Sequence, residues 1–157
     1  MMCSEKLRFF GHYTVEAIEP KTGRVVRRWE YDNLITDLFY SGLFSLLNEA
    51  IEKPDGDALN ITHIALGTGE TLPALADTRL GTEYFRKAVS SKTHSGHIFT
   101  CKLSMLPSEG NGAVKELGVF VKATDAADSG TLISHCAANF EKNANLKMLI
   151  TWTMTIA

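Results

Sequence analysis

The sequence is poor in cysteine, and its charges almost balance. Its three cysteines, Cys3, Cys101 and Cys136, are an odd and sparse set, unlike the dense, even sets of small secreted domains. We therefore expect reduced thiols. The formal net charge is −2, so the chain lacks the general attraction to nucleic acid or to anionic membranes that a basic protein has. No nucleic-acid partner is expected.

Long hydrophobic runs are also missing. Polar residues such as Thr36, Asp37 and Glu49 interrupt the most apolar window, 34–51, which falls short of the roughly 20 apolar residues of a membrane-spanning helix. The N-terminus carries Glu5, Lys6 and Arg8 around few apolar residues and lacks the apolar core of a signal peptide. We expect no membrane partner, and synthesis and use in a cytoplasm or release from one by lysis.

What is present is the composition of a globular protein. Of the 157 residues, 45% are apolar and 22% charged, and a chain of about this length buries about 70% of its unfolded surface. We expect a single domain, 1–157, in which residues 1–10 form an N-terminal arm that orders on a partner.

Two-residue alternation dominates the chain and predicts β-strands. A β-hairpin is expected over 11–33, because Pro20 and Gly23 suit a tight turn between two strands. Four later segments alternate in the same way, over 97–105, 113–122, 131–140 and 146–156. Strands at such short spacing are typical of an all-β fold, and we expect an antiparallel β-sandwich whose core spans 61–157.

One helix is expected, over 36–52. Thr36 or Asp37 can supply an N-cap oxygen, and apolar residues recur at helical spacing from Leu38 to Ile51. The segment 53–56, with a proline and a glycine, ends the helix. A helix with so broad an apolar stripe must pack on the face of a sheet or on a neighbouring subunit.

The segment 61–89 predicts a strand followed by a long ordered loop. Gly67 and Gly69 permit positive φ, and Asp77 and Thr78 can accept hydrogen bonds from backbone N–H groups. We expect the carboxylate of Glu83 to pair with Arg86 or with backbone N–H groups, which would hold the loop closed.

Glu116 lies in an apolar strand, where a carboxylate needs a partner because burying an unpaired charge is costly. Arg79 or Arg86 could provide that partner, across the fold or across a subunit boundary. We expect a structural role for this glutamate.

No set of residues predicts catalysis. His94 and His97 lack nearby Cys, Asp or Glu to complete a metal site, although histidines of three chains could converge on a trimer axis. His135 and Cys136 point to opposite faces of one strand, and Cys101 and Cys136 are better explained as small buried residues.

Two further combinations also fall short. The stretch 67–70 lacks the lysine and spacing of a phosphate loop, and Asp77 and Glu83 lack an accompanying nucleophile or base. We expect no enzyme, no catalytic residue, no cofactor and no metal.

The pattern of structural residues resembles small bacteriophage virion proteins of the tail, fibre or baseplate type. The resemblance rests on the run 65–69 followed by Pro73, Asp77, Thr78, Leu80, Glu83 and Arg86. The hairpin and the "NLIT" junction within 11–37, the segment 114–120 and the closing LKMLITWTMTI have the same character. The resemblance covers nearly the whole chain but includes no catalytic signature.

The resemblance implies a non-enzymatic structural component of a phage tail that acts in virion assembly, located in the virion and bound to other virion proteins. It also implies a homo-oligomer, for which we expect a trimer. A capsid decoration or neck protein, or a receptor- or carbohydrate-binding module of a tail fibre, is the alternative. Aromatic and arginine side chains favour interfaces, so we expect assembly contacts at Leu7, Phe9, Phe10, Arg24, Arg27, Arg28 and Trp29, and along the loop 66–86.

Overall fold

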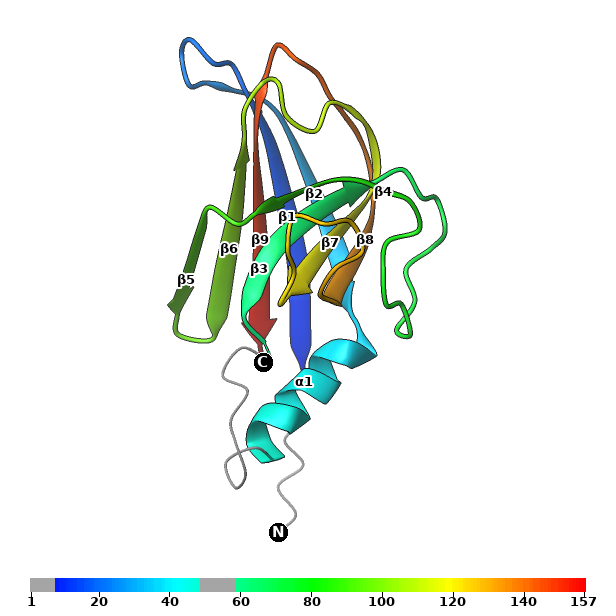
Figure 1. The fold of residues 1–157 in the computed structure, drawn as a ribbon. Coiled ribbons are helices and arrows are strands. Elements are labelled where there is room, and N and C mark those ends of the chain that lie inside the picture. Colours follow the sequence, from blue (N-terminus) through cyan, green and yellow to red (C-terminus); the bar gives the residue numbers. More distant parts are fainter. Residues whose placement is uncertain (1–7, 49–58) are drawn as a thin grey trace.

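The computed structural model describes residues 8–48 and 59–157, which form a curled β-sheet with one helix at its end (Figure 1). The first part of the chain comprises β1 (Phe9–Ile18), β2 (Val25–Ile35), α1 (Asp37–Asn48) and β3 (Ile61–Gly67). The second part comprises β4 (Glu83–Ala88), β5 (Ser91–Ser95), β6 (Ile98–Met105), β7 (Gly112–Val121), β8 (Thr131–Lys142) and β9 (Lys147–Ile156). α1 is not long and apolar enough to cross a membrane.

All nine strands belong to one antiparallel sheet, in the order β4-β3-β7-β8-β2-β1-β9-β6-β5. The link between its two halves is narrow, because β2 pairs with β8 only through Leu34 opposite His135 and Ile35 opposite Ser134. The sheet therefore curls into a half-barrel. The expectation of an all-β, antiparallel fold is confirmed, but two separate sheets are not found.

The outermost strands of the sheet, β4 and β5, are consecutive in the chain and separated by only Val89 and Ser90. The N–H of Val89 donates to the carbonyl of Thr62 in β3 at 2.9 Å, and the N–H of Ser90 donates to that of Lys102 in β6 at 2.7 Å. The continuous segment β4–β5 thus pairs first with β3, at one edge of the sheet, and then with β6, at the other edge. A strand that leaves one half of a sheet for the other in this way is how corners form in β-folds.

The core lies inside the curl, between the two halves. Alternate residues of β1, β6 and β9 point into it and are buried, among them Tyr13, Leu103 and Trp152. They form one hydrophobic cluster with residues of the opposite half, such as Leu66 and Leu117. The two-residue period read from the sequence places this interior face correctly.

The helix begins one residue later than expected, and 49–52, its expected end, lies outside the described residues. Thr36 does not cap it with its side chain, because its hydroxyl donates to the carbonyl of Leu132 at 2.7 Å. The first helical N–H group, of Asp37, instead donates to the carbonyl of Leu75 at 2.9 Å. The start of α1 is therefore tied both to β8 and to the loop that follows β3.

Candidate functional site

A fully buried carboxylate holds the long loop between β3 and β4. Glu116, on β7, is 1% exposed. Its two oxygens accept hydrogen bonds from the backbone N–H groups of Gly69 (2.9 Å), Gly81 (2.9 Å) and Thr82 (2.8 Å). These donors lie at the two ends of the loop 68–82, so a single side chain closes the loop at its base.

Two glycines make this arrangement possible, for a reason different from the expected one. Neither Gly67 nor Gly69 has positive φ, so the prediction about their backbone conformation was wrong. A Cβ atom at these positions would lie 2.3 and 2.4 Å from Oε1 of Glu116. They are required because the backbone approaches the carboxylate too closely for any side chain.

His135 bridges this carboxylate to the loop. It is 4% exposed on β8, with Nε2 3.0 Å from Oε2 of Glu116 and Nδ1 2.7 Å from Oδ2 of Asp77. Each ring nitrogen of this histidine therefore has one carboxylate partner. The cluster Glu116–His135–Asp77 is called the carboxylate clamp below.

The clamp favours the charged form of Glu116. Burial pushes the pKa of this carboxyl upward, but the N–H groups of Thr82, Gly81 and Gly69 together with the His135 ring outweigh it. The net pKa is lowered from its ordinary value, as for other carboxylates that accept several backbone hydrogen bonds. Both ring nitrogens of His135 are engaged within the cluster, at 2.7 and 3.0 Å from carboxylate oxygens.

The partners expected for Glu116 across the fold were wrong, since within this chain its hydrogen bonds come from the loop backbone and His135 and not from Arg79 or Arg86. Arg79 is exposed on the rim of a polar groove beside the loop, together with Thr78. The missed partner is His135. Glu116 lies opposite Ala137 in the β7–β8 pair, and side chains of residues two positions apart on a neighbouring strand can touch diagonally. Only the register, which the sequence did not reveal, brings them together.

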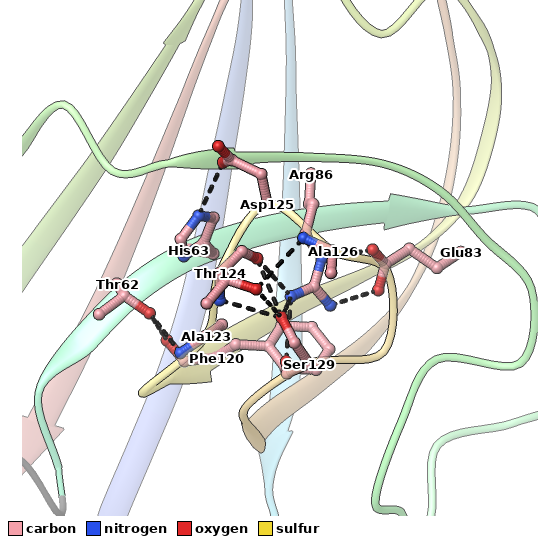
Figure 2. Close-up of polar contacts among 10 residues, drawn as sticks. All are labelled: Thr62, His63, Glu83, Arg86, Phe120, Ala123, Thr124, Asp125, Ala126 and Ser129. Atoms are coloured by element: carbon pink, nitrogen blue, oxygen red, sulfur yellow. Dashed lines mark hydrogen bonds and ion pairs between the residues drawn. The ribbon is translucent and has the colours of Figure 1, made fainter.

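The ion pair expected between Glu83 and Arg86 is present and buried (Figure 2). Nε and Nη2 of Arg86 donate to the two carboxylate oxygens of Glu83 at 2.5 and 2.7 Å. The guanidinium carbon lies 4.6 Å from the ring centre of Phe120. This bidentate geometry is the strongest form of an arginine–carboxylate pair.

The pair holds a different loop from the expected one. Nη1 of Arg86 donates to the carbonyls of Thr124 (3.1 Å) and Ser129 (3.0 Å) and to the hydroxyl of Ser129 (2.8 Å). These acceptors lie in the connection between β7 and β8, shown in Figure 2. His63 lies beside them and contacts Asp125 at 3.2 Å. Arg86 therefore fixes 122–130, whereas Glu116 fixes 68–82.

The tip of the clamped loop is apolar and exposed. Leu72 is 79% exposed and Leu75 is 51% exposed. The turn 74–77, which carries Leu75, is closed by Asp77, whose Oδ2 accepts the N–H of Ala74 at 2.7 Å and whose N–H donates to the carbonyl of Ala74 at 3.1 Å. The same Oδ2 atom meets His135, so the clamp extends to the exposed tip.

The residues expected at an interface lie in two places. Arg24, Arg27 and Arg28 are exposed on the β1–β2 hairpin, and Arg28 pairs with Glu30 at 2.7 Å. Trp29 is half-buried, with its ring centre 5.3 Å from that of Phe140. This hairpin ends in a turn on the side of the sheet away from α1 (Figure 1).

The aromatic part of the N-terminal arm belongs to β1, at the other end of the sheet. Phe10 is 51% exposed, whereas Phe9 packs with its ring centre 5.1 Å from that of Phe39 in α1. Leu7 lies outside the described residues. Phe9 also lines an apolar pocket of about 450 Å³ beside the helix, whose other lining residues are Phe39, Leu43, Leu59, Ile61, Phe99, Ile133, Met154 and Ile156.

Neither described cysteine has the surroundings of a nucleophile. Cys101 and Cys136 are buried free thiols, and burial raises the pKa of each to about 12, which disfavours the reactive thiolate. Within 8–48 and 59–157, no group of three or more His, Cys, Asp and Glu side chains could hold a metal ion. His94 lies on the exposed strand β5, and His97 lies in the turn that follows it.

Comparison with known proteins gives no further assignment. No protein family, no curated protein and no solved structure matches this chain.

Proposed function

We propose that this chain is a non-enzymatic structural component of a bacteriophage tail, a fibre, baseplate or adaptor protein, that mediates virion assembly. The observation that carries the proposal is the clamped loop 68–82. It presents Leu72 and Leu75 to solvent on a backbone held by a buried ionic cluster. A protein contact surface that is ordered before binding costs less entropy when it binds.

The contacts of the His135 ring also favour a structural role. Of the buried polar groups near the loop, its imidazole would be the natural general base. Both of its nitrogens contact carboxylates, at 2.7 and 3.0 Å. The cluster is therefore better suited to holding the loop in place than to catalysis.

We also propose that the two halves of the sheet act as the two layers of a sandwich, with α1 packed at one end. The shared hydrophobic cluster supports this, because residues of β1 and β9 meet residues of β3 and β7 within it. A rigid two-layer body would present the clamped loop and the β1–β2 hairpin at fixed positions. We expect this body to assemble as a homotrimer, as the resemblance to phage tail proteins implies.

Immunogold electron microscopy of particles from the lysate in which the chain is made tests the proposal. Label at the tail end is the expected result. Label over the head would replace it with the decoration or neck alternative, and particles without label would contradict a virion role. Binding of the purified protein to host-surface glycans would favour the receptor-binding alternative.

A variant identifies the surface responsible. Leu72→Asp places a charge at the exposed tip without touching the clamp, so we expect a folded protein that no longer enters particles. Thr93→Asp on β5, which is also exposed, is the matched control and should enter normally. Equal incorporation of the two variants would show that the loop tip is not the assembly contact.

A further inference from the structure

The most unusual residue outside the carboxylate clamp is a buried lysine. Lys142, the last residue of β8, is 1% exposed. It continues the inward-facing alternation of Ala138 and Phe140, so its side chain enters the end of the core that lies away from α1. Lysine is almost never fully buried unless its charge is paired.

The atoms that surround its amino group carry no formal charge. Nζ lies 2.9 Å from the carbonyl oxygens of Pro107 and Asn143 and 2.9 Å from Oδ1 of Asn111. Burial lowers the pKa of this amine, and the charge of Glu109 offsets the shift only in part. A lowered pKa increases the share of the neutral amine, which is the nucleophilic form.

The sheet holds the amine against the Asn111 carboxamide. Lys142 is directly opposite Gly112 in the β7–β8 pair, which places Asn111 beside it. The turn that carries Asn111 is itself fixed, because Oε2 of Glu109 accepts the N–H of Leu106 at 2.8 Å and a proton of Lys87 Nζ at 2.6 Å. Two reacting groups held in contact in this way gain a large rate advantage over the same groups free in solution.

We propose that Lys142 and Asn111 join in an intramolecular isopeptide bond. The neutral Nζ attacks Cγ of Asn111, and a C–N bond forms to give a tetrahedral intermediate. A proton then passes from the attacking nitrogen to the amide nitrogen of Asn111, and we assign this transfer to the carboxylate of Glu109, whose charge acts on Lys142. The original C–N bond breaks, its electron pair leaves with the nitrogen as ammonia, and a secondary amide remains.

The products fit the site. Asn111 is exposed on its outer side, so ammonia can leave to solvent. The reaction replaces a buried amine that is costly to charge with a neutral amide, and it fastens the turn 106–111 to the end of β8. The inference stands apart from the proposed virion role, because it depends only on this end of the sheet.

The chain contains its own control. Lys115 and Asn139 also pair across β7 and β8, with Nζ 2.8 Å from Oδ1, but this pair is exposed. Water surrounds this exposed pair, so proximity alone should not produce a bond there. The two pairs separate the effect of contact from the effect of burial.

Intact-mass spectrometry of the purified full-length chain tests the proposal. The expected mass is lower than the sequence mass by one ammonia, and digestion should release a branched peptide that joins Asn111 to Lys142. Asn111→Ala and Lys142→Arg should both restore the mass expected from their sequences. A wild-type chain that keeps its full mass after prolonged incubation at mildly alkaline pH would overturn the proposal, as would a lost ammonia that maps to Lys115 and Asn139.

The role of Glu109 is tested by the rate. In freshly made protein followed over time, we expect Glu109→Gln to slow the loss of ammonia at least tenfold, with a native circular dichroism spectrum. An unchanged rate in this variant would remove Glu109 from the proton transfer. Lys87→Arg, which retains a cation beside Glu109, should leave the rate near that of the wild type.

Discussion

Two loops of this protein are fastened by buried charges of opposite sign. Glu116 holds the loop 68–82 through backbone N–H groups and His135, and Lys142 holds the turn 106–111 through oxygen atoms. Each charged group is about 1% exposed. The pKa of both groups is lowered, which has opposite meanings for an acid and for a base.

For Glu116 a lowered pKa favours the charged form, so the charge and its surroundings match. For Lys142 burial lowers the pKa, which disfavours the charged form, and the nearby charge of Glu109 offsets this only in part. A buried carboxylate that accepts several hydrogen bonds stays charged, whereas a buried amine whose partners are neutral oxygen atoms is prone to lose its proton. The Glu116 site is therefore suited to holding its loop permanently, whereas the Lys142 site is suited to a chemical reaction of its amine.

The largest expected effect comes from removing the charge of the clamp. Glu116→Gln removes the negative charge beside His135 and leaves one amide oxygen for three backbone N–H donors. We expect the free energy of unfolding to fall by about 3 kcal/mol, the range seen when one member of a buried ion pair is removed. Chemical denaturation measures it. Glu70→Gln, an exposed position in the same loop, is the control, and equal stability of the two variants would refute the clamp.

A change of pH should produce a smaller version of the same effect. Since the pKa of Glu116 is lowered on folding from its ordinary value of 4.5, its contribution to stability is complete above that value and is lost as the pH falls through the folded pKa. The stability gap between wild type and Glu116→Gln should therefore narrow below about pH 4.5. Denaturation curves of both proteins from pH 6 to pH 3 measure the gap, and a gap that widens in acid would contradict this assignment.

The hydrogen bonds between Lys142 and its neutral oxygen partners should contribute less to stability than the carboxylate clamp does. In an Asn111→Ala background, where no cross-link can form, adding Lys142→Met leaves the carbonyls of Pro107 and Asn143 without this donor. We expect a loss of about 1 kcal/mol relative to Asn111→Ala alone, the usual net value of such hydrogen bonds. Thermal unfolding of the two variants provides the comparison. A loss as large as that of Glu116→Gln would remove the contrast between the two sites.

The sequence predicts the strands better than it predicts the contacts between them. Alternation located β6, β7, β8 and β9 to within a few residues, and in β6 and β9 it follows the burial of every second residue in the core. It gave no sign of β5, whose five residues are all exposed, nor of the single curled sheet, because curling depends on which strands become neighbours.

The candidate site shows the same limit. The ion pair of Glu83 with Arg86 was predictable because the two residues are three positions apart in the chain. The partner of Glu116 was not, because the β7–β8 register contains two irregularities that no local pattern reveals. His135 carried a signal only as a polar residue close to apolar Leu132, Ile133 and Cys136, because a polar side chain rarely enters a core without a partner.

The smallest expected effect provides the baseline for the comparison of buried charges. Arg28 pairs with Glu30 at 2.7 Å, but the side chains are 56% and 53% exposed, and exposed pairs usually contribute less than about 1 kcal/mol. We expect Arg28→Ala to change the free energy of unfolding by less than about 0.5 kcal/mol. If the hairpin is an assembly surface, the same variant should nevertheless enter particles poorly. Reduced stability together with normal incorporation would reverse both expectations, because Arg28 would then stabilise the hairpin and contact no partner.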